Sequence, residues 1–513
     1  MVDQTWIRRL ASHPLGLRTK RDYDADTGDP QNRQRYQMNF LPFSTVYDPA
    51  EDPPGSVDPL GTLSEAERLA DVLLPGFTVR MWRPRLLTFT AVASVIADRV
   101  VRLTGREEDR LEARLVFERL FVAGVSRQAE DNPDDYRNAT ARLPGRTLAE
   151  RAWRDAEPLR SGNFLKGQAV NGPYGVMARL SRSLGLVDGN GHLGRNGPDL
   201  LLAWSSDQGL TDYLEDPDQA DGEGVKWAKL VTKTVSQGIG KQGAWPNRNQ
   251  QIWEMLASRI RPDQVTGEER KAIIRALTAE PVRRRMFELL SAPESLNVYR
   301  TGLDQERGAL ERAVLLDSVA QLLKPEEPTD RLIASCLRAI DAYEKASAVL
   351  QQVFDALLWG LRQKSGRATP KEVLELALVS RAIQRAVSNA EPAAKALEKS
   401  VAEFKDLHLL DAAARSQALE LIRDDVVLCR ESVENAVSAV MGRHEKVQRT
   451  KRKATWVDCG QVWMLMPGYG TGANRPPEYR NAFLHPMRIV NGFSFLRELG
   501  MARIPNMVAG DDI

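Results

Sequence analysis

The chain has 513 residues and a mass of 57.3 kDa, more than one hydrophobic core usually organises, so we expect two or three domains. Hydrophobic residues make up 42% and charged residues 27% of the chain, which excludes a disordered or a fibrous protein. The 71 basic and 69 acidic residues leave a net charge of +2, so the total charge does not indicate a polyanionic partner.

The sequence predicts a cytoplasmic protein with no membrane partner. It contains no run of about 18 apolar residues, the length that a membrane-spanning helix needs. The N-terminus has an acid at position 3 and lacks the apolar segment of a secretory signal. Cys336, Cys429 and Cys459 lie too far apart for a disulfide framework or a zinc cluster, which indicates a reducing compartment.

Residues 1–62 are rich in Pro, Gly and Asp and contain several aromatic residues, a composition that predicts an extended N-terminal arm packed on another part of the chain. A helical region over 63–260 follows. Ser64 with acids behind it predicts a helix start, and Pro75-Gly76 predicts its end. Further helices are expected at about 84–101 and 107–124.

Residues 163–205 predict a winged helix-turn-helix segment. Val176, Leu180 and Leu184 share one helical face, and Gly185 ends that helix. A short strand, a Gly/Asn turn and another helix follow, which is the order of a winged helix. The stretch resembles the leucine and glycine pattern of many bacterial winged-helix proteins over about 35 residues. Arg179 and Arg182, three residues apart on its helix, are therefore candidate DNA contacts.

Residues 261–449 predict a bundle of long helices. Two series of mostly apolar residues have heptad spacing, separated by a break at 366–370 and by a middle helix that we expect to break near Pro392. The first series is Cys336, Ile340, Tyr343, Ser347, Leu350, Phe354, Leu357 and Leu361; the second is Leu419, Ile422, Val426, Cys429, Val433, Ala436 and Val440. An intramolecular bundle would bury Leu350, Phe354, Leu357, Val426 and Val433. The alternative is a helical arm for a homo-oligomer or a partner.

Residues 450–513 predict a small basic C-terminal module. The stretch 455–466 favours a β-hairpin, and 487–499 favours a closing helix that ends at Gly500. Residues 441–513 carry 11 basic and 6 acidic residues, a difference of +5. The nearly neutral chain therefore has a basic end.

No motif predicts a catalytic residue, a cofactor or a metal site. Residues 238–243 match G-x-G-x-x-G, but lysines and threonines rather than a buried strand precede them. His444-Glu445 has Gln448 where a zinc protease needs its second histidine. Neither a serine-hydrolase elbow nor a phosphate-binding P-loop occurs. A nuclease built from scattered acids stays open.

Two basic segments are candidate nucleic-acid contacts. No acid lies between Glu223 and Glu254, where Trp227, Trp245 and Trp253 accompany lysines and amides. Basic side chains neutralise phosphates, and exposed indoles can stack on bases. The candidates are Lys226, Lys229, Lys233, Lys241, Trp245 and Arg248 in this segment, and Arg449, Lys451, Arg452 and Lys453 in the second. The alternative for each is an ordinary solvated face.

Residues 73–76, Leu-Leu-Pro-Gly, come shortly before Arg80, Arg83 and Arg85 and an apolar helix. This junction resembles bacterial proteins from phage-defence gene clusters, over about 60–205 and the final 70 residues. We therefore predict a mainly α-helical, multidomain bacterial protein. Its predicted role is that of a non-enzymatic nucleic-acid-binding or scaffolding subunit, with an antiviral defence complex as one setting. A kleisin-like protein–protein adaptor and a metal-dependent nuclease are the alternatives.

Overall fold

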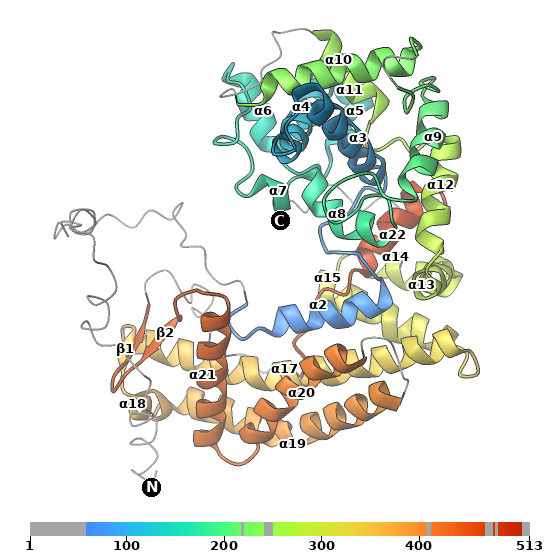
Figure 1. Cartoon of the computed structure of the whole chain (residues 1–513). Coiled ribbons are helices and arrows are strands. Elements are labelled where there is room, and N and C mark those ends of the chain that lie inside the picture. The colour runs from blue at the N-terminus through green and yellow to red at the C-terminus, as the bar shows by residue number, and fades with distance from the viewer. Residues whose placement is uncertain are drawn as a thin grey trace, which may run out of the picture. The chain divides into compact units, whose positions relative to one another are not determined.

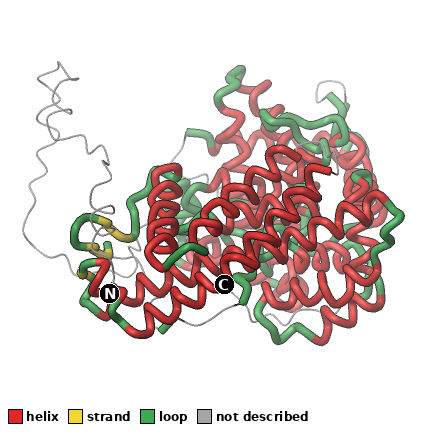
Figure 2. The backbone as a smooth tube through the Cα atoms, turned by 90° about the horizontal axis from the view of Figure 1, so that it is seen from below, coloured by secondary structure: helices red, strands yellow, loops and turns green. Residues whose placement is uncertain are grey.

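The computed structural model describes residues 58–216, 220–240, 250–406, 412–466, 476–477 and 481–504. Residues 1–57 of the predicted N-terminal arm lie outside this part. The chain divides into two compact units (Figure 1). Unit 1 comprises 1–66 and 338–483, and unit 2 comprises 67–337 and 484–513. Both are helical, and the described strands form one small sheet (Figure 2), so the predicted mainly α composition is confirmed.

Unit 2 contains most of the helices, and α2 (Thr62–Leu73) and α17 (Pro328–Gln363) each contribute to both units. Its other helices are α3 (Leu86–Thr104), α4 (Asp109–Asp131), α5 (Pro133–Thr140), α6 (Arg146–Arg154), α7 (Gln168–Asn171), α8 (Pro173–Ser183), α9 (Gly197–Asp207), α10 (Glu223–Gly238), α11 (Gln250–Arg259), α12 (Gly267–Thr278), α13 (Pro281–Ser291), α14 (Pro293–Thr301), α15 (Arg307–Ala313), the π-helix η2 (Val314–Val319), α16 (Ala320–Leu322) and α22 (Ile489–Glu498). The predicted boundary at 260–261 falls between α11 and α12, both in this unit.

The core of unit 2 is built around α3. This helix is apolar over most of its circumference, and its residues from Leu86 to Ala97 are all buried, as expected for a helix enclosed by others. Phe89 packs on Phe117 and Phe121 of α4, with ring centroids 5.4 and 4.5 Å away. Gly105 ends the helix in the left-handed conformation, at a φ of 70°. The helices expected at 84–101 and 107–124 are thus present as α3 and α4.

A buried ion pair links the start of α3 to α12. The Arg85 side chain donates from Nε to Oε1 of Glu269 at 3.1 Å, and the two side chains are 1% and 0% exposed. The Thr88 hydroxyl donates to the same carboxylate oxygen at 2.6 Å. The other guanidinium nitrogens of Arg85 donate to the carbonyl groups of Arg261 and Arg259. Both charges therefore have partners inside the core.

The region predicted as a winged helix contains a helix, a short hairpin and a helix. Val176, Leu180 and Leu184 of the α8 region are buried as expected. The hairpin has one antiparallel bridge, between Val187 and Leu193. The Asp188 carboxylate holds its turn, because it accepts hydrogen bonds from the backbone N–H groups of Asn190 and His192. The order of elements agrees with the prediction, while the winged-helix identity itself stays a prediction.

Unit 1 is a helical bundle with a small sheet. It contains most of α17, together with β1 (Arg367–Ala368), α18 (Pro370–Leu374), α19 (Ala377–Asp406), α20 (Ala412–Cys429), α21 (Val433–Thr450), β2 (Val457–Cys459) and β3 (Trp463–Leu465). Figure 1 shows α19 and α20 running side by side. Every residue of the first heptad-spaced series is buried along α17. This burial within one chain favours the intramolecular bundle over an exposed oligomerisation arm.

The second heptad-spaced series is not one helix, which corrects the sequence interpretation. It divides between α20, which ends at Cys429, and α21, which begins at Val433. Val426 is buried as predicted, but Val433 is only half-buried because it is the first residue of α21. The side chain of Ser432 caps that helix by accepting from the backbone N–H of Asn435 at 3.1 Å. The four-residue step from Cys429 to Val433 therefore spans a turn.

The break expected near Pro392 is also absent, because α19 continues through it from Ala377 to Asp406. A proline inside a helix removes one hydrogen bond and usually kinks or ends it. Here Ala390, Ala393 and Ala394 are buried on both sides of the proline. The helix is therefore packed in the core on both sides of the proline.

The predicted C-terminal hairpin is confirmed as β2 and β3. Val457 pairs with Leu465 and Cys459 with Trp463 in antiparallel register. The strand β1, from far earlier in the chain, adds to the free edge of β3 and gives the order β1-β3-β2. The predicted closing helix is α22, which Gly500 follows at a φ of 65°.

Candidate nucleic-acid interface

The helix α10 presents the clearest basic surface among the predicted candidates. The Asp212 carboxylate holds its N-terminus, because it accepts from the backbone N–H groups of Gly224 and Val225 at 2.8 and 3.2 Å. The apolar side of the helix is buried in unit 2 and contains Val225, Trp227, Ala228, Val231 and Val235. The opposite side is left to solvent.

Lys226, Lys229 and Lys233 lie on that solvent side, and all three are exposed. Residues three and four positions apart are neighbours on a helix surface, so the three ammonium groups form one face about 10 Å long. We call these three residues the α10 lysine face. Lys226 lies 3.5 Å from the carboxylate of Glu223, an exposed pair of little energetic weight. No carboxylate of the described residues forms an ion pair with Lys229 or Lys233.

Two tryptophans of the same segment, Trp227 and Trp253, differ from the expectation of exposed indoles. Trp227 is 4% and Trp253 2% exposed, so neither can stack on a base from solvent. Trp227 instead packs edge-to-face on Trp204 and Tyr213, with ring centroids 5.8 and 5.7 Å away. Successive residues of a helix point in different directions around its axis, so Trp227 faces the core while its neighbour Lys226 faces solvent. Three other candidates, Lys241, Trp245 and Arg248, lie outside the described residues.

The two arginines of α8 are accessible. Arg182 is exposed, and Arg179 is 47% exposed while it forms an ion pair with Asp71 at 2.9 Å. Neither side chain is enclosed in a buried ion pair, so Arg179 and Arg182 both remain candidate DNA contacts. The neighbouring hairpin contacts α3, because the His192 ring lies 3.1 Å from the Asp98 carboxylate of that helix. The helix α3 packs against both α8 and α10.

The second basic segment belongs to unit 1, at the end of α21. Arg449 is exposed and forms an ion pair with Glu445, one turn earlier. Lys451 is half-buried, with its ammonium group 3.4 Å from the Asp58 carboxylate. Arg452 and Lys453 are exposed in the turn that follows, where Arg452 has a φ of 54°. Arg449 and Lys451 thus have carboxylate neighbours within unit 1.

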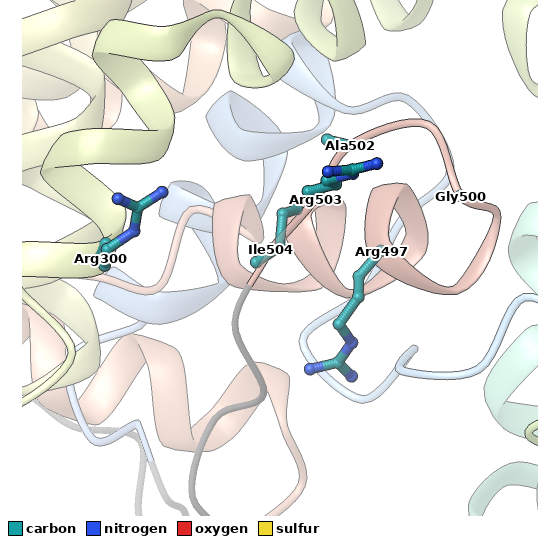
Figure 3. A pocket seen from close by; sticks show the side chains of 6 residues that line it. All are labelled: Arg300, Arg497, Gly500, Ala502, Arg503 and Ile504. Carbon is teal, nitrogen blue, oxygen red and sulfur yellow. The ribbon is translucent and has the colours of Figure 1, made fainter.

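Sequence reasoning missed a hollow in unit 2 that arginine side chains line (Figure 3). Its volume is about 550 Å³, and its lining residues are Arg300, Arg497, Gly500, Ala502, Arg503 and Ile504. We call it the arginine hollow. Arg300 comes from α14 and the others from α22 and the segment after it, almost 200 positions later. No local motif could have brought them together.

Comparison with known proteins adds no relative. No protein-family model, curated protein or solved structure gives a significant match to the chain. A proposed function therefore has to come from the residues themselves.

The histidine and carboxylate side chains of the described residues bear on the nuclease alternative. No group of three or more His, Cys, Asp or Glu side chains among them could hold a metal ion. His444 is a core residue: its Nδ1 lies 3.0 Å from the Pro59 carbonyl oxygen, and its Nε2 accepts from the backbone N–H of Trp456 at 2.9 Å. Burial lowers the pKa of this imidazole below its usual value.

The buried carboxylate of Glu118 also has a structural role. Burial raises its pKa to about 7, and its oxygens accept from the backbone N–H of Tyr174 and the side chain of Gln168, both at 2.8 Å. It therefore holds the start of α8 against α4.

No described helix is both long and apolar enough to span a membrane.

Proposed function

We propose that the chain is a non-enzymatic, nucleic-acid-binding subunit that contacts a phosphate backbone through the α10 lysine face. The observation that carries this proposal is the exposure of Lys226, Lys229 and Lys233 on one side of one helix. Lysine ammonium groups neutralise phosphates and release the counterions condensed on DNA, and of the three only Lys226 has an ion-pair partner among the described residues, the exposed Glu223. Such contacts orient a protein on the backbone without reading the sequence of bases.

Further contacts are proposed at the other predicted positions. In a winged helix formed by α8, the hairpin and α9, the accessible Arg179 and Arg182 would contact the same ligand. Arg449, Arg452 and Lys453 are the exposed members of the second basic segment, in unit 1, and Lys451 is half-buried. Lys241, Trp245 and Arg248 are candidates on sequence grounds. Membership of a bacterial complex, with antiviral defence as one setting, rests on the sequence resemblance and on no structural observation.

Binding of duplex DNA by the full chain should weaken steeply as salt rises. Each phosphate that the protein neutralises releases about 0.9 counterion, so log K should fall linearly with log salt. A filter-binding titration at three salt concentrations, with and without Mg²⁺ or Mn²⁺, measures this slope and any cleavage.

The same titration separates the alternatives. No retention of DNA even at the lowest salt would contradict our proposal and favour the protein–protein adaptor. Conversion of bound DNA to shorter product on addition of metal would favour the nuclease. Intact DNA with a steep salt slope is the result that we expect.

A further inference from the structure

We propose that the arginine hollow of unit 2 binds a ligand that carries several linked phosphate groups, such as a triphosphate. This site goes beyond the proposed DNA backbone contacts, because it uses a different element and a different residue type. The ligand chemistry is shared by a free nucleoside triphosphate and by the triphosphorylated 5′ end of an RNA.

The hollow combines space with concentrated positive charge. Three of its six lining residues are arginines, and none of the six is acidic. Arg300 and Arg503 are exposed, and no carboxylate of the described residues forms an ion pair with either. Figure 3 shows Arg300 extending from α14 while Arg503 and Ile504 lie on the segment after α22. The guanidinium groups do not converge on one point, but exposed side chains can rotate onto a ligand.

The chain turn after α22 fixes where Arg503 emerges. Gly500 adopts a φ of 65°, and the backbone N–H of Met501 donates to the Leu496 carbonyl at 2.8 Å. This is the hydrogen-bond pattern that commonly closes a helix C-terminus. It directs residues 502–504 back beside α22, so Arg503 and Arg497 line the same hollow.

The carboxylates near the hollow are already engaged. Glu498 accepts from Arg83 and lies 3.7 Å from Arg497. Glu311 accepts from Nε of Arg307 at 3.1 Å and is also bound by backbone N–H groups of the segment leading into α22. Both carboxylates therefore already have arginine partners.

The charge excess around the hollow extends to Arg142. Burial lowers the pKa of Arg142, and the like charges of Arg307, Arg497 and Arg83 lower it further. An incoming polyanion would relieve this repulsion.

The lining favours phosphate recognition over base recognition. None of the six residues is aromatic, so the hollow offers no ring on which a base could stack. The nearby indole of Trp82 is occupied by guanidinium groups, that of Arg142 at 3.6 Å and that of Arg307 at 5.1 Å from the ring centroid. Arginine forks bind phosphate oxygens in pairs, and a volume of about 550 Å³ suits a ligand of triphosphate size.

Calorimetric titration of the full chain with inorganic tripolyphosphate at low salt tests the site. We expect binding, and we expect Arg300→Gln and Arg503→Gln each to weaken it about tenfold, because each removes a charge-assisted hydrogen-bond donor. Arg497→Lys keeps the charge of the half-buried position and should weaken it less. Arg381→Gln, which removes an exposed arginine of α19 in unit 1, should leave the affinity unchanged.

Absence of binding by the wild-type chain, or an equal loss in the Arg381→Gln control, would overturn the site. Titrations with ATP, GTP and a 5′-triphosphorylated RNA then identify the source of the phosphates, and ATP and GTP should bind alike. Duplex DNA without 5′ phosphates should bind Arg300→Gln as it binds the wild-type chain. A failure of the hollow is thereby distinguishable from a failure of the α10 lysine face.

Discussion

Phe354→Ala should lower the free energy of unfolding of unit 1 by about 3–5 kcal/mol, the usual cost of deleting a core phenylalanine ring. Phe354 is 0% exposed on α17. Its ring lies 4.9 Å from the His444 ring and 5.9 Å from the Trp456 ring, measured between centroids. Truncation would therefore leave a cavity where α17, α21 and the start of the sheet meet.

Urea unfolding of the full chain, followed by circular dichroism and tryptophan fluorescence, measures this loss. Leu428→Ala is the matched control, because Leu428 lies on α20 of the same bundle but is 47% exposed. It should cost about 0.5 kcal/mol or less. Equal effects of the two substitutions would contradict the intramolecular bundle.

Glu269→Ala should destabilise unit 2 by about 3–5 kcal/mol, because it leaves the Arg85 guanidinium buried without its carboxylate. The cost comes from the unpaired charge more than from the lost contact. Arg85 is 1% exposed and cannot reach water without movement of the start of α3. The Thr88 hydroxyl would lose its acceptor in the same step.

The double variant Arg85→Met/Glu269→Ala separates these contributions, since it removes both charges. Chemical unfolding should show it to be more stable than Glu269→Ala alone. A double variant that is less stable than the single one would mean that the hydrogen bonds of Arg85 to the Arg259 and Arg261 carbonyls, and not its charge pairing, stabilise the start of α3.

The sequence predicted the buried face of a helix where the hydrophobic periodicity lay within that one helix. The step of three and four residues along α17 identified its buried face, because a helix that packs on one side needs that spacing. The same rule misled at Cys429 and Val433, where a short turn happens to preserve the spacing. The sequence also did not reveal that α19 continues through Pro392.

The candidate sites divide in a similar way. The absence of acids between Glu223 and Glu254 predicted a basic surface there. Lys226, Lys229 and Lys233, which form the α10 lysine face, are exposed in the structure. Composition alone did not reveal that Trp227 faces the core, although its position relative to Lys226 on the helix contains that information. The arginine hollow was out of reach, because tertiary folding joins Arg300 to Arg497.

The salt dependence of DNA binding in a lysine-face variant tests the central proposal most directly. Replacing Lys226, Lys229 and Lys233 together with Ala should lower the slope of log K against log salt by up to about 3 units, equally for all DNA sequences. The control replaces Lys364, Lys371 and Lys395, three exposed lysines of unit 1, and removes the same charge. We predict an unchanged slope for this control. Equal slopes for the wild-type chain and the α10 variant, or an equal fall in the control, would contradict DNA binding through the α10 lysine face.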